Sequence, residues 1–255
     1  MGLIAELPEI TLLLAAVVAI CAGFVKGVVG FGMPLLMISG LASLLPAEIA
    51  LAALIVPTVV TNGYQALRQG WVAARRTITR YRVFLLSMTL FIALSAQLVA
   101  VLPETTFFIV LGVPIVAFCI FQLSGWVPRL KPENQSRDEA VVGAVAGISG
   151  GLSGVWGPPT ILYLTAINTP KLEQMRVQGV IYGMGAVVLV VAHLRSGIFN
   201  AETAPLSALL LVPALTGMFL GGLVNDKLPQ STFTRVTLIV LTVAGLNLIR
   251  KGLWG

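Results

Sequence analysis

A-G-F-V-K-G-V-V-G-F-G-M-P, from Ala22 to Pro34, returns about 124 residues later as A-G-I-S-G-G-L-S-G-V-W-G-P-P, from Ala146 to Pro159. The glycines keep their spacing, and a one-residue insertion around Trp156 brings the prolines back into register. Both stretches interrupt apolar runs. Hydrophobic segments that are broken at matching places in two halves of a chain are typical of the binding sites of membrane transporters.

Composition places the whole chain in a membrane. Of its 255 residues, 57% are hydrophobic and only 10% are charged, and the mean hydropathy is +0.97. Soluble domains carry about 25% charged residues. We therefore expect one membrane transporter domain over residues 1–255. Glu6 and Glu9 stand where a cleavable signal would carry positive charge, so we expect the apolar run from Ile10 to be retained.

The correspondence between the halves continues beyond the two broken stretches. L-P-E-T-T-F from Leu102 to Phe107 matches L-P-Q-S-T-F from Leu228 to Phe233. A polar stretch with two prolines separates the halves. We predict repeat one over residues 1–123, a linker over residues 124–138 and repeat two over residues 139–255.

Each half begins with two short apolar pieces, one on either side of the break, and continues with three longer segments. In the first half the pieces are about Ile10 to Phe24 and Pro34 to Leu45. The second piece is roughly 18 Å long as a helix, too short for a hydrocarbon core of about 30 Å. Each pair forms either a re-entrant hairpin or one broken span. We expect an all-α integral membrane protein with two inverted-topology repeats, each with a Gly/Pro-broken re-entrant helix pair plus three transmembrane helices.

Positive charge favours the re-entrant arrangement. Loops rich in Lys and Arg face the cytoplasm, and five arginines crowd the connection between Arg68 and Arg82. Re-entrant pairs put twelve basic residues inside and three outside, whereas single crossings put eleven inside and four outside. We expect a multi-pass protein of the cell inner membrane with both termini extracytoplasmic. The net charge of +6 then serves orientation in the bilayer and does not predict nucleic-acid binding.

The polar residues do not assemble into a catalytic or metal-binding pattern. Cys21 and Cys119 lie in apolar runs without CxxC spacing, and His193 is the only histidine. A lone histidine cannot supply a base, its orienting group and a nucleophile together. We expect no enzymatic activity, no cofactor and no metal.

The broken stretches predict an anion site. Half-helices that start near Pro34 and Pro158 from opposite faces would point their free N–H groups and positive dipole ends at the membrane middle. Lys26 adds a cation to an apolar run, which is costly unless the side chain faces a cavity or a partner. Alternatively, Lys26 snorkels to an interface or binds carbonyl groups of its own helix.

The first glycines of each stretch have an alternative role of their own. Gly23 with Gly27 and Gly147 with Gly151 are G-x-x-x-G pairs, which allow two helices to approach closely. This alternative explains the later glycines, such as Gly154, less well.

We therefore predict that a small anionic substrate is bound by residues of both breaks and by one arginine near the start of the segment after the second break. These residues are Lys26, Gly30, Phe31, Gly32, Pro34, Ser153, Gly154, Trp156, Gly157, Pro158, Pro159 and Arg176.

The two stretches, in this order and spacing, resemble the TauE/SafE family of sulfite and organosulfur-anion permeases. The resemblance covers essentially the whole chain and includes the L-P-Q-S-T-F turn. It implies transport of sulfite, sulfoacetate, thiosulfate or a related sulfonate. Gly30-Phe31-Gly32-Met33 departs from the consecutive glycines of many members, and Phe31 and Trp156 would narrow the pocket.

The residues themselves predict an anion but not its sulfur, because helix ends and a lysine would bind a carboxylate nearly as well. A carboxylate permease and an anion channel of the same fold are the alternatives.

None of the ten acidic residues stands in the middle of an apolar segment. An interior-negative potential drives anions outward by about 2.3 kcal/mol per charge per 100 mV. We therefore expect export, which requires no coupling ion.

Overall fold

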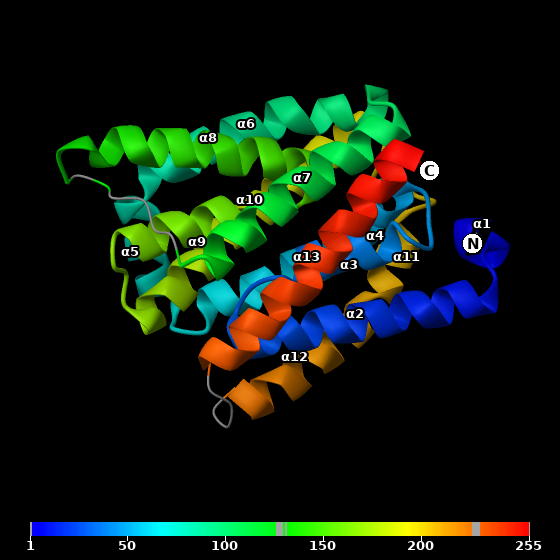
Figure 1. Ribbon diagram of the computed structural model, residues 1–255, viewed down its shortest axis with the longest axis horizontal. Helices are drawn as coiled ribbons and strands as arrows, with labels where there is room; N and C mark the ends of the chain where they lie inside the picture. Colours follow the sequence, from blue (N-terminus) through cyan, green and yellow to red (C-terminus); the bar gives the residue numbers. More distant parts are fainter. Residues whose placement is uncertain (1, 126–129, 131, 226–229, 255) are drawn as a thin grey trace.

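The computed structural model describes residues 2–125, 130, 132–225 and 230–254, and these fold into helices joined by short connections (Figure 1). The helices are α1 (Gly2–Glu6), α2 (Glu9–Val29), α3 (Met33–Leu41), α4 (Ala47–Leu67), α5 (Trp71–Arg80), α6 (Arg82–Ser95), η1 (Ala96–Val101), α7 (Glu104–Leu123), η2 (Pro132–Asn134), α8 (Gln135–Ser153), α9 (Gly157–Ala166), α10 (Lys171–Ser196), α11 (Ala204–Leu209), α12 (Leu211–Asn225) and α13 (Gln230–Trp254). The described part contains no strand, as the all-α prediction requires.

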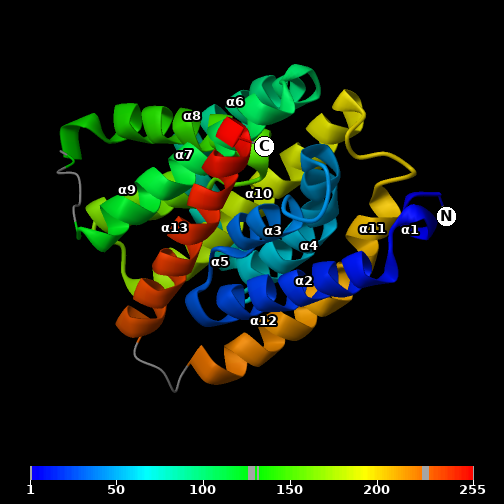
Figure 2. The ribbon, with the colours of Figure 1, turned by 45° about the vertical axis from the view of Figure 1, so that its right-hand side comes forward.

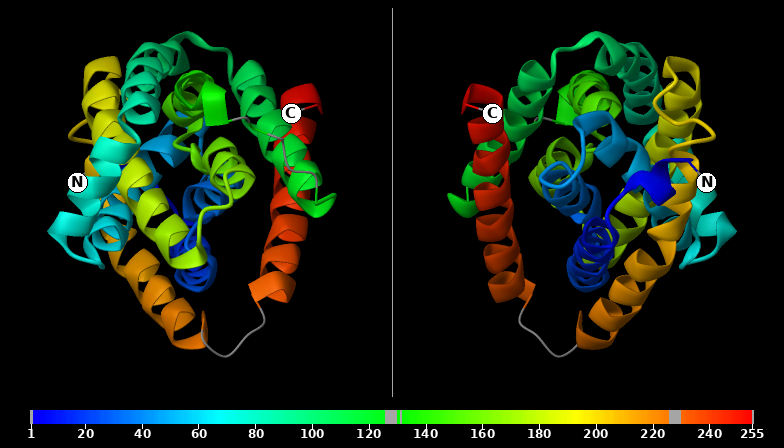
Figure 3. Two further views of the ribbon diagram at one scale, coloured as in Figure 1. Left: turned by 90° about the vertical axis from the view of Figure 1, so that its left-hand side faces the viewer. Right: turned by 90° about the vertical axis from the view of Figure 1, so that its right-hand side faces the viewer.

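The main packing contacts join helices that lie far apart in the sequence. α2 lies along α12, α6 along α8, α7 along α13 and α4 along α10 (Figures 1 and 2). Seen from either end, the short helices α3 and α9 lie inside a ring that includes α6, α7, α12 and α13 (Figure 3). Each break is therefore enclosed by protein, where irregular backbone is tolerated at membrane depth.

Glycines bring the paired backbones into direct contact. A Cβ atom added to Gly23 would lie 2.1 Å from the carbonyl oxygen of Ala214, and one added to Gly221 would lie 2.1 Å from that of Phe24. At Gly147 the corresponding distance to the Met88 carbonyl is 2.6 Å. The first glycines of both stretches therefore serve close helix packing, which is the alternative that the sequence left open.

The helix directions follow from the same contacts. α2 and α12 are parallel, because Gly23 faces Ala214 and Gly27 faces Met218. α4 and α10 are antiparallel, because Gly179 faces Ala66 and Gly183 faces Asn62. In Figure 1, α2 and α4 both begin at the end of the molecule that holds the two termini, so α3 turns back toward that end. Inverted repeats with re-entrant helix pairs require these helix directions. The inverted repeats and the re-entrant pairs themselves stay predictions.

Six helical segments are long and apolar enough to cross a membrane: Glu9–Val29, Ala47–Leu67, Arg82–Val99, Thr105–Leu123, Glu173–Ser196 and Ala204–Val224. The set, which was sought among the described residues only, includes α2, which the sequence suggested was too short, and five of the six spans that the sequence predicted. α2 continues past Phe24 to Val29 because Gly30, with φ of 83°, is the first residue in a left-handed conformation. α3 covers nine residues and cannot cross alone.

The predicted linker contains the start of a helix. α8 begins at Gln135, inside the predicted linker, and Asp138 lies in its first turn, where a negative charge favours the helix dipole. Of the linker, residues 126–129 and 131 lie outside the described residues. The L-P-Q-S-T-F turn is described only from Gln230, where α13 begins.

A proline inside α4 is compensated by α11. Pro57 has no N–H, so the carbonyl of Ala53 loses its helical donor. The Ser207 hydroxyl donates to that carbonyl at 3.0 Å and accepts from the N–H of Val56 at 2.9 Å. The Pro57 carbonyl in turn accepts from the Thr61 hydroxyl at 2.6 Å. These contacts fix the part of α4 that carries Thr61 and Asn62.

A buried carboxylate joins three elements at the end of the molecule opposite the termini. Glu139 of α8 is 2% exposed and lies 3.2 Å from an Arg80 guanidinium nitrogen. The same carboxylate accepts from the Gln135 amide at 2.7 Å and from the Tyr163 hydroxyl at 3.3 Å. Three donors compensate for the loss of water around this carboxylate.

Candidate functional site

The helix that precedes each break ends in nearly the same way. α2 ends when the Gly30 N–H donates to the Lys26 carbonyl at 2.8 Å, and α8 ends when the Gly154 N–H donates to the Gly150 carbonyl at 2.7 Å. The φ angles of these glycines are 83° and 71°. Only glycine adopts such angles without strain. The repeated glycines at 30 and 154 are therefore required by the breaks themselves.

Both breaks meet at one small cavity. Its lining comes from the two stretches, from Asn62 of α4 and from Tyr182 of α10, and comprises Lys26, Phe31, Gly32, Pro34, Leu35, Asn62, Gly154, Val155, Trp156, Gly157 and Tyr182. The cavity volume is about 20 Å³, room for about one water molecule. The structure thus brings together seven of the twelve predicted site residues, which come from both halves of the chain.

Lys26 is the cation of this cavity. Its side chain is 2% exposed, and Nζ donates to the Thr61 hydroxyl at 3.0 Å and to Asn62 Oδ1. The ion pairs of the described residues are Arg80 with Glu139 and Arg176 with Glu173, so Lys26 has no carboxylate partner among them. Neutral oxygens solvate the ammonium group without cancelling its charge.

The second break supplies an aromatic wall in place of a second cation. Gly150 corresponds to Lys26, and a Cβ atom added there would lie 2.7 Å from the Trp156 ring. Trp156 is 1% exposed, and its ring centroid lies 6.4 Å from that of Tyr182. The Tyr182 hydroxyl donates to the Gly157 carbonyl at 3.4 Å. The cavity is therefore charged on the first-half side and aromatic on the second-half side.

The half-helix starts offer unequal numbers of backbone donors. α3 begins at Met33 with Pro34 as its second residue, so one early N–H is missing. α9 begins at Gly157 and is followed by Pro158 and Pro159, so two are missing. The first break therefore presents more free N–H groups to an anion.

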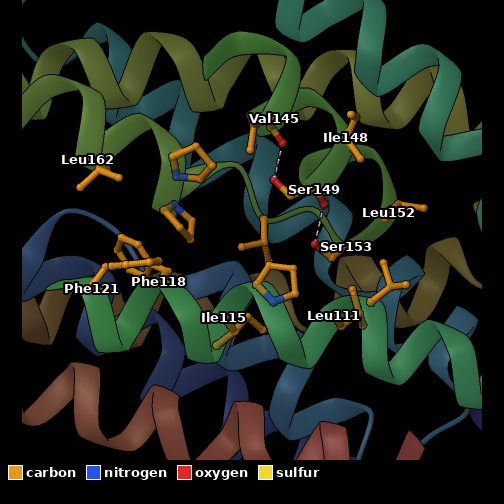
Figure 4. Close-up of a pocket in the computed structure, with 15 residues that line it drawn as sticks. Leu111, Ile115, Phe118, Phe121, Val145, Ile148, Ser149, Leu152, Ser153 and Leu162 are labelled. Atoms are coloured by element: carbon orange, nitrogen blue, oxygen red, sulfur yellow. Dashed lines mark hydrogen bonds between the residues drawn. The ribbon is translucent and has the colours of Figure 1, made fainter. Parts of the chain in front are cut away.

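Three predicted residues line a different space. Ser153, Pro158 and Pro159 face a groove of about 370 Å³ between α7, α8 and α9 (Figure 4). The Ser149 and Ser153 hydroxyls donate to carbonyls of their own helix, at 3.0 and 2.6 Å. Among the described residues, no charged side chain lines this groove. Its chemistry suits an apolar occupant better than an anion.

Arg176 is not brought to the cavity. Its guanidinium donates to the Thr77 hydroxyl at 3.1 Å and to the Gln69 amide oxygen at 3.2 Å, and lies 3.4 Å from the Glu173 carboxylate. These contacts join α10 to α5 and the turn before it.

A wider vestibule approaches Lys26 from the end that carries α5. It has a volume of about 430 Å³ and is lined by Lys26, Gly27, Gly30, Tyr64, Gln65, Arg68, Met175, Leu215, Met218, Phe219, Gly222 and Leu223. Lys26 and Arg68 are its charged residues among those described. Lys26 thus lines both the vestibule and the cavity, and the charge along this route is positive.

The sequence missed the polar residues that the unbroken helices contribute, namely Thr61, Asn62, Gln65 and Tyr182. One signal was available. The α4 segment contains T-N-G-Y-Q and has a mean hydropathy of 1.4, the lowest of the six candidate spans. Polar residues inside an apolar span face the protein interior or a cavity.

Helices able to cross a bilayer, together with two broken helices that meet at a buried cation, define an integral membrane transport protein. The chain belongs to the family described as sulfite exporter TauE/SafE, whose family model matches residues 15–248. Comparisons with curated proteins and with solved structures give no match.

Proposed function

We propose that the protein carries a small oxyanion across the cell inner membrane and that the anion is the counter-charge of Lys26. The observation that carries this proposal is a lysine that is 2% exposed and whose partners, among the residues that the structure describes, are neutral oxygens. Leaving a buried charge uncompensated is strongly unfavourable. A bound anion removes that cost, and the free N–H groups near Met33 support its oxygens.

Family membership supports a sulfur-containing anion. Sulfite, thiosulfate, sulfoacetate and related sulfonates all carry a negative charge on exposed oxygens, as this site requires. Phe31 and Trp156 form the walls on either side of the breaks. Their bulk favours the smaller members of this group.

The two spaces support a carrier in preference to a channel. The cavity of about 20 Å³ is too small for a four-atom oxyanion such as sulfite, so the anion enters only when the breaks or their neighbours move apart. The vestibule of about 430 Å³ lies beside it. A protein that opens this cavity toward one side of the membrane at a time works by alternating access. An interior-negative potential makes export the favoured direction.

The test is a thermal-shift screen of the detergent-purified protein with sulfite, thiosulfate, sulfoacetate, sulfate, acetate and chloride. A bound anion at about one hundred times its Kd stabilises the folded state by about 2.7 kcal/mol. We expect a sulfur anion to raise the melting temperature of the wild type by several degrees and to have no effect on Lys26→Ala.

Lys251→Ala is the matched control, because the Lys251 ammonium binds the Ala42 carbonyl at 2.8 Å, outside the cavity. That variant should keep the full response. Equal stabilisation of Lys26→Ala and wild type would remove Lys26 from the site. Selective stabilisation by acetate would instead identify a carboxylate permease.

Proteoliposomes test the direction. An inside-negative potential should speed efflux of the anion, and unlabelled anion on the far side should accelerate exchange of labelled anion. Flux that neither saturates nor shows exchange would indicate a channel.

A further inference from the structure

Two glutamines, one from α4 and one from α10, lie next to Gly30. A Cβ atom added to Gly30 would lie 3.6 Å from Gln65 Nε2 and 3.6 Å from Gln178 Oε1. Gln65 Nε2 donates to the Gly30 carbonyl at 3.0 Å and to the Met175 carbonyl at 3.1 Å. Gln65 thus holds the first break in place.

Gln178 is 3% exposed, and its Oε1, like the Oε1 of Gln65, is buried without a hydrogen-bond partner. A buried amide oxygen that accepts no hydrogen bond costs roughly 1–3 kcal/mol. Such an atom calls for an explanation, and its place beside the first break makes a bound ligand the explanation to test.

Position along α10 places Gln178 between the two spaces. Met175 lines the vestibule and Tyr182 lines the cavity. Residues 175, 178 and 182 share one helix face. α4 shows the same order, because Gln65 lines the vestibule and Asn62, three residues earlier, lines the cavity. Gly30 and the two glutamines therefore mark the boundary that an anion crosses between vestibule and cavity.

We infer that Gln178 is an anion-binding residue at this boundary, where its amide nitrogen donates to the oxyanion that Lys26 neutralises. The inference rests on the proposed function. Rotation about the terminal torsion of glutamine exchanges Oε1 and Nε2 and is soft. An arriving oxyanion thus meets an ammonium group on α2 and, after this rotation, an amide N–H on α10 in place of the oxygen that has no partner in the empty protein.

The test compares Gln178→Leu, Gln178→Glu and wild type by calorimetric titration with sulfite and thiosulfate. Loss of one hydrogen bond to a charged group should weaken binding roughly 10- to 100-fold in Gln178→Leu. Gln178→Glu should abolish detectable binding, because a carboxylate at the same place repels the anion and competes for Lys26. The melting temperature of ligand-free Gln178→Leu should equal or exceed that of the wild type, since the change removes a buried amide oxygen that has no partner.

Gln122→Leu is the matched control. Its amide nitrogen is also buried without a partner, but it lies near the end of α7 and lines neither space. Binding should be unchanged in this variant.

Two results would overturn the inference. In the first, Gln178→Leu binds the anion with wild-type affinity while Lys26→Ala fails to bind. In the second, Gln178→Leu binds more weakly but its ligand-free melting temperature also falls by a large amount. If the wild type itself binds no anion, the proposed function fails and this inference with it.

Discussion

At the scale of single residues, the site consists of one ammonium group among neutral oxygens. Thr61 and Asn62 accept from Lys26, and neither brings a negative charge. A protein carboxylate in the same position would satisfy the lysine permanently. The neutral environment therefore leaves room for an exchangeable anion.

Asn62→Asp tests this reasoning with almost no change of volume. The new carboxylate would pair with Lys26, so we expect sulfite affinity to fall at least roughly tenfold, with no loss of stability in the ligand-free protein. Calorimetric titration and thermal melting measure the two quantities. Asn247→Asp, at a half-buried residue of α13 that does not line the cavity, is the control and should bind normally. Unchanged sulfite binding by Asn62→Asp would show that the anion does not approach Lys26.

At the scale of elements, neighbouring glycines of α12 have different roles. A Cβ atom on Gly221 would lie 2.1 Å from the Phe24 carbonyl, whereas one on Gly222 meets nothing within 4 Å. Gly221→Ala should lower the free energy of unfolding by about 1–3 kcal/mol or more, because the backbones of α2 and α12 must separate. Gly222→Ala should be neutral or stabilising by up to about 1 kcal/mol, through helix propensity.

Thermal melting in detergent compares these two glycine variants. Similar melting temperatures for both would mean that α2 and α12 do not touch at Gly221.

The second prediction for elements concerns Glu139, which receives donors from α5, α8 and α9. Glu139→Ala leaves the Tyr163 hydroxyl without this acceptor and should cost about 1–3 kcal/mol of unfolding free energy. Glu133→Ala removes an exposed carboxylate nearby and should stay within about 0.5 kcal/mol of wild type. Equal stability of the two variants would show that the cluster does not join these helices.

At the scale of the whole molecule, both termini lie at one end, and α5 with its arginines lies at the other (Figure 1). Positively charged connections face the cytoplasm. Alkaline phosphatase fused at residue 1 or at residue 255 should therefore be active. A fluorescent protein that is bright only in the cytoplasm should be dark at both positions. A fluorescent insertion after Gly70 should be bright. Opposite signals from the two termini would exclude the inverted arrangement.

The sequence predicted the features that depend on local chemistry. It missed the features that depend on packing between helices. The breaks at Gly30 and Gly154 could be predicted because a left-handed glycine followed by a proline start is a local signal. Gln178 and Tyr182 could not, because one polar residue in an apolar helix acquires its role only from the helices that face it. The end of α2 was misplaced because Lys26 and Gly27 look like breakers, whereas contact with α12 keeps them helical.

The pairing of α2 with α12 also has a consequence for biosynthesis. Residues 20 to 27 leave the ribosome almost two hundred residues before the glycines at 217 and 221 that they contact. α2, with its lysine, therefore remains without this partner until nearly the whole chain has been translated. If a ribosome stalls after α10, the face of α2 that packs against α12 stays open to lipid. The incomplete chain would then be a substrate for membrane quality-control proteases.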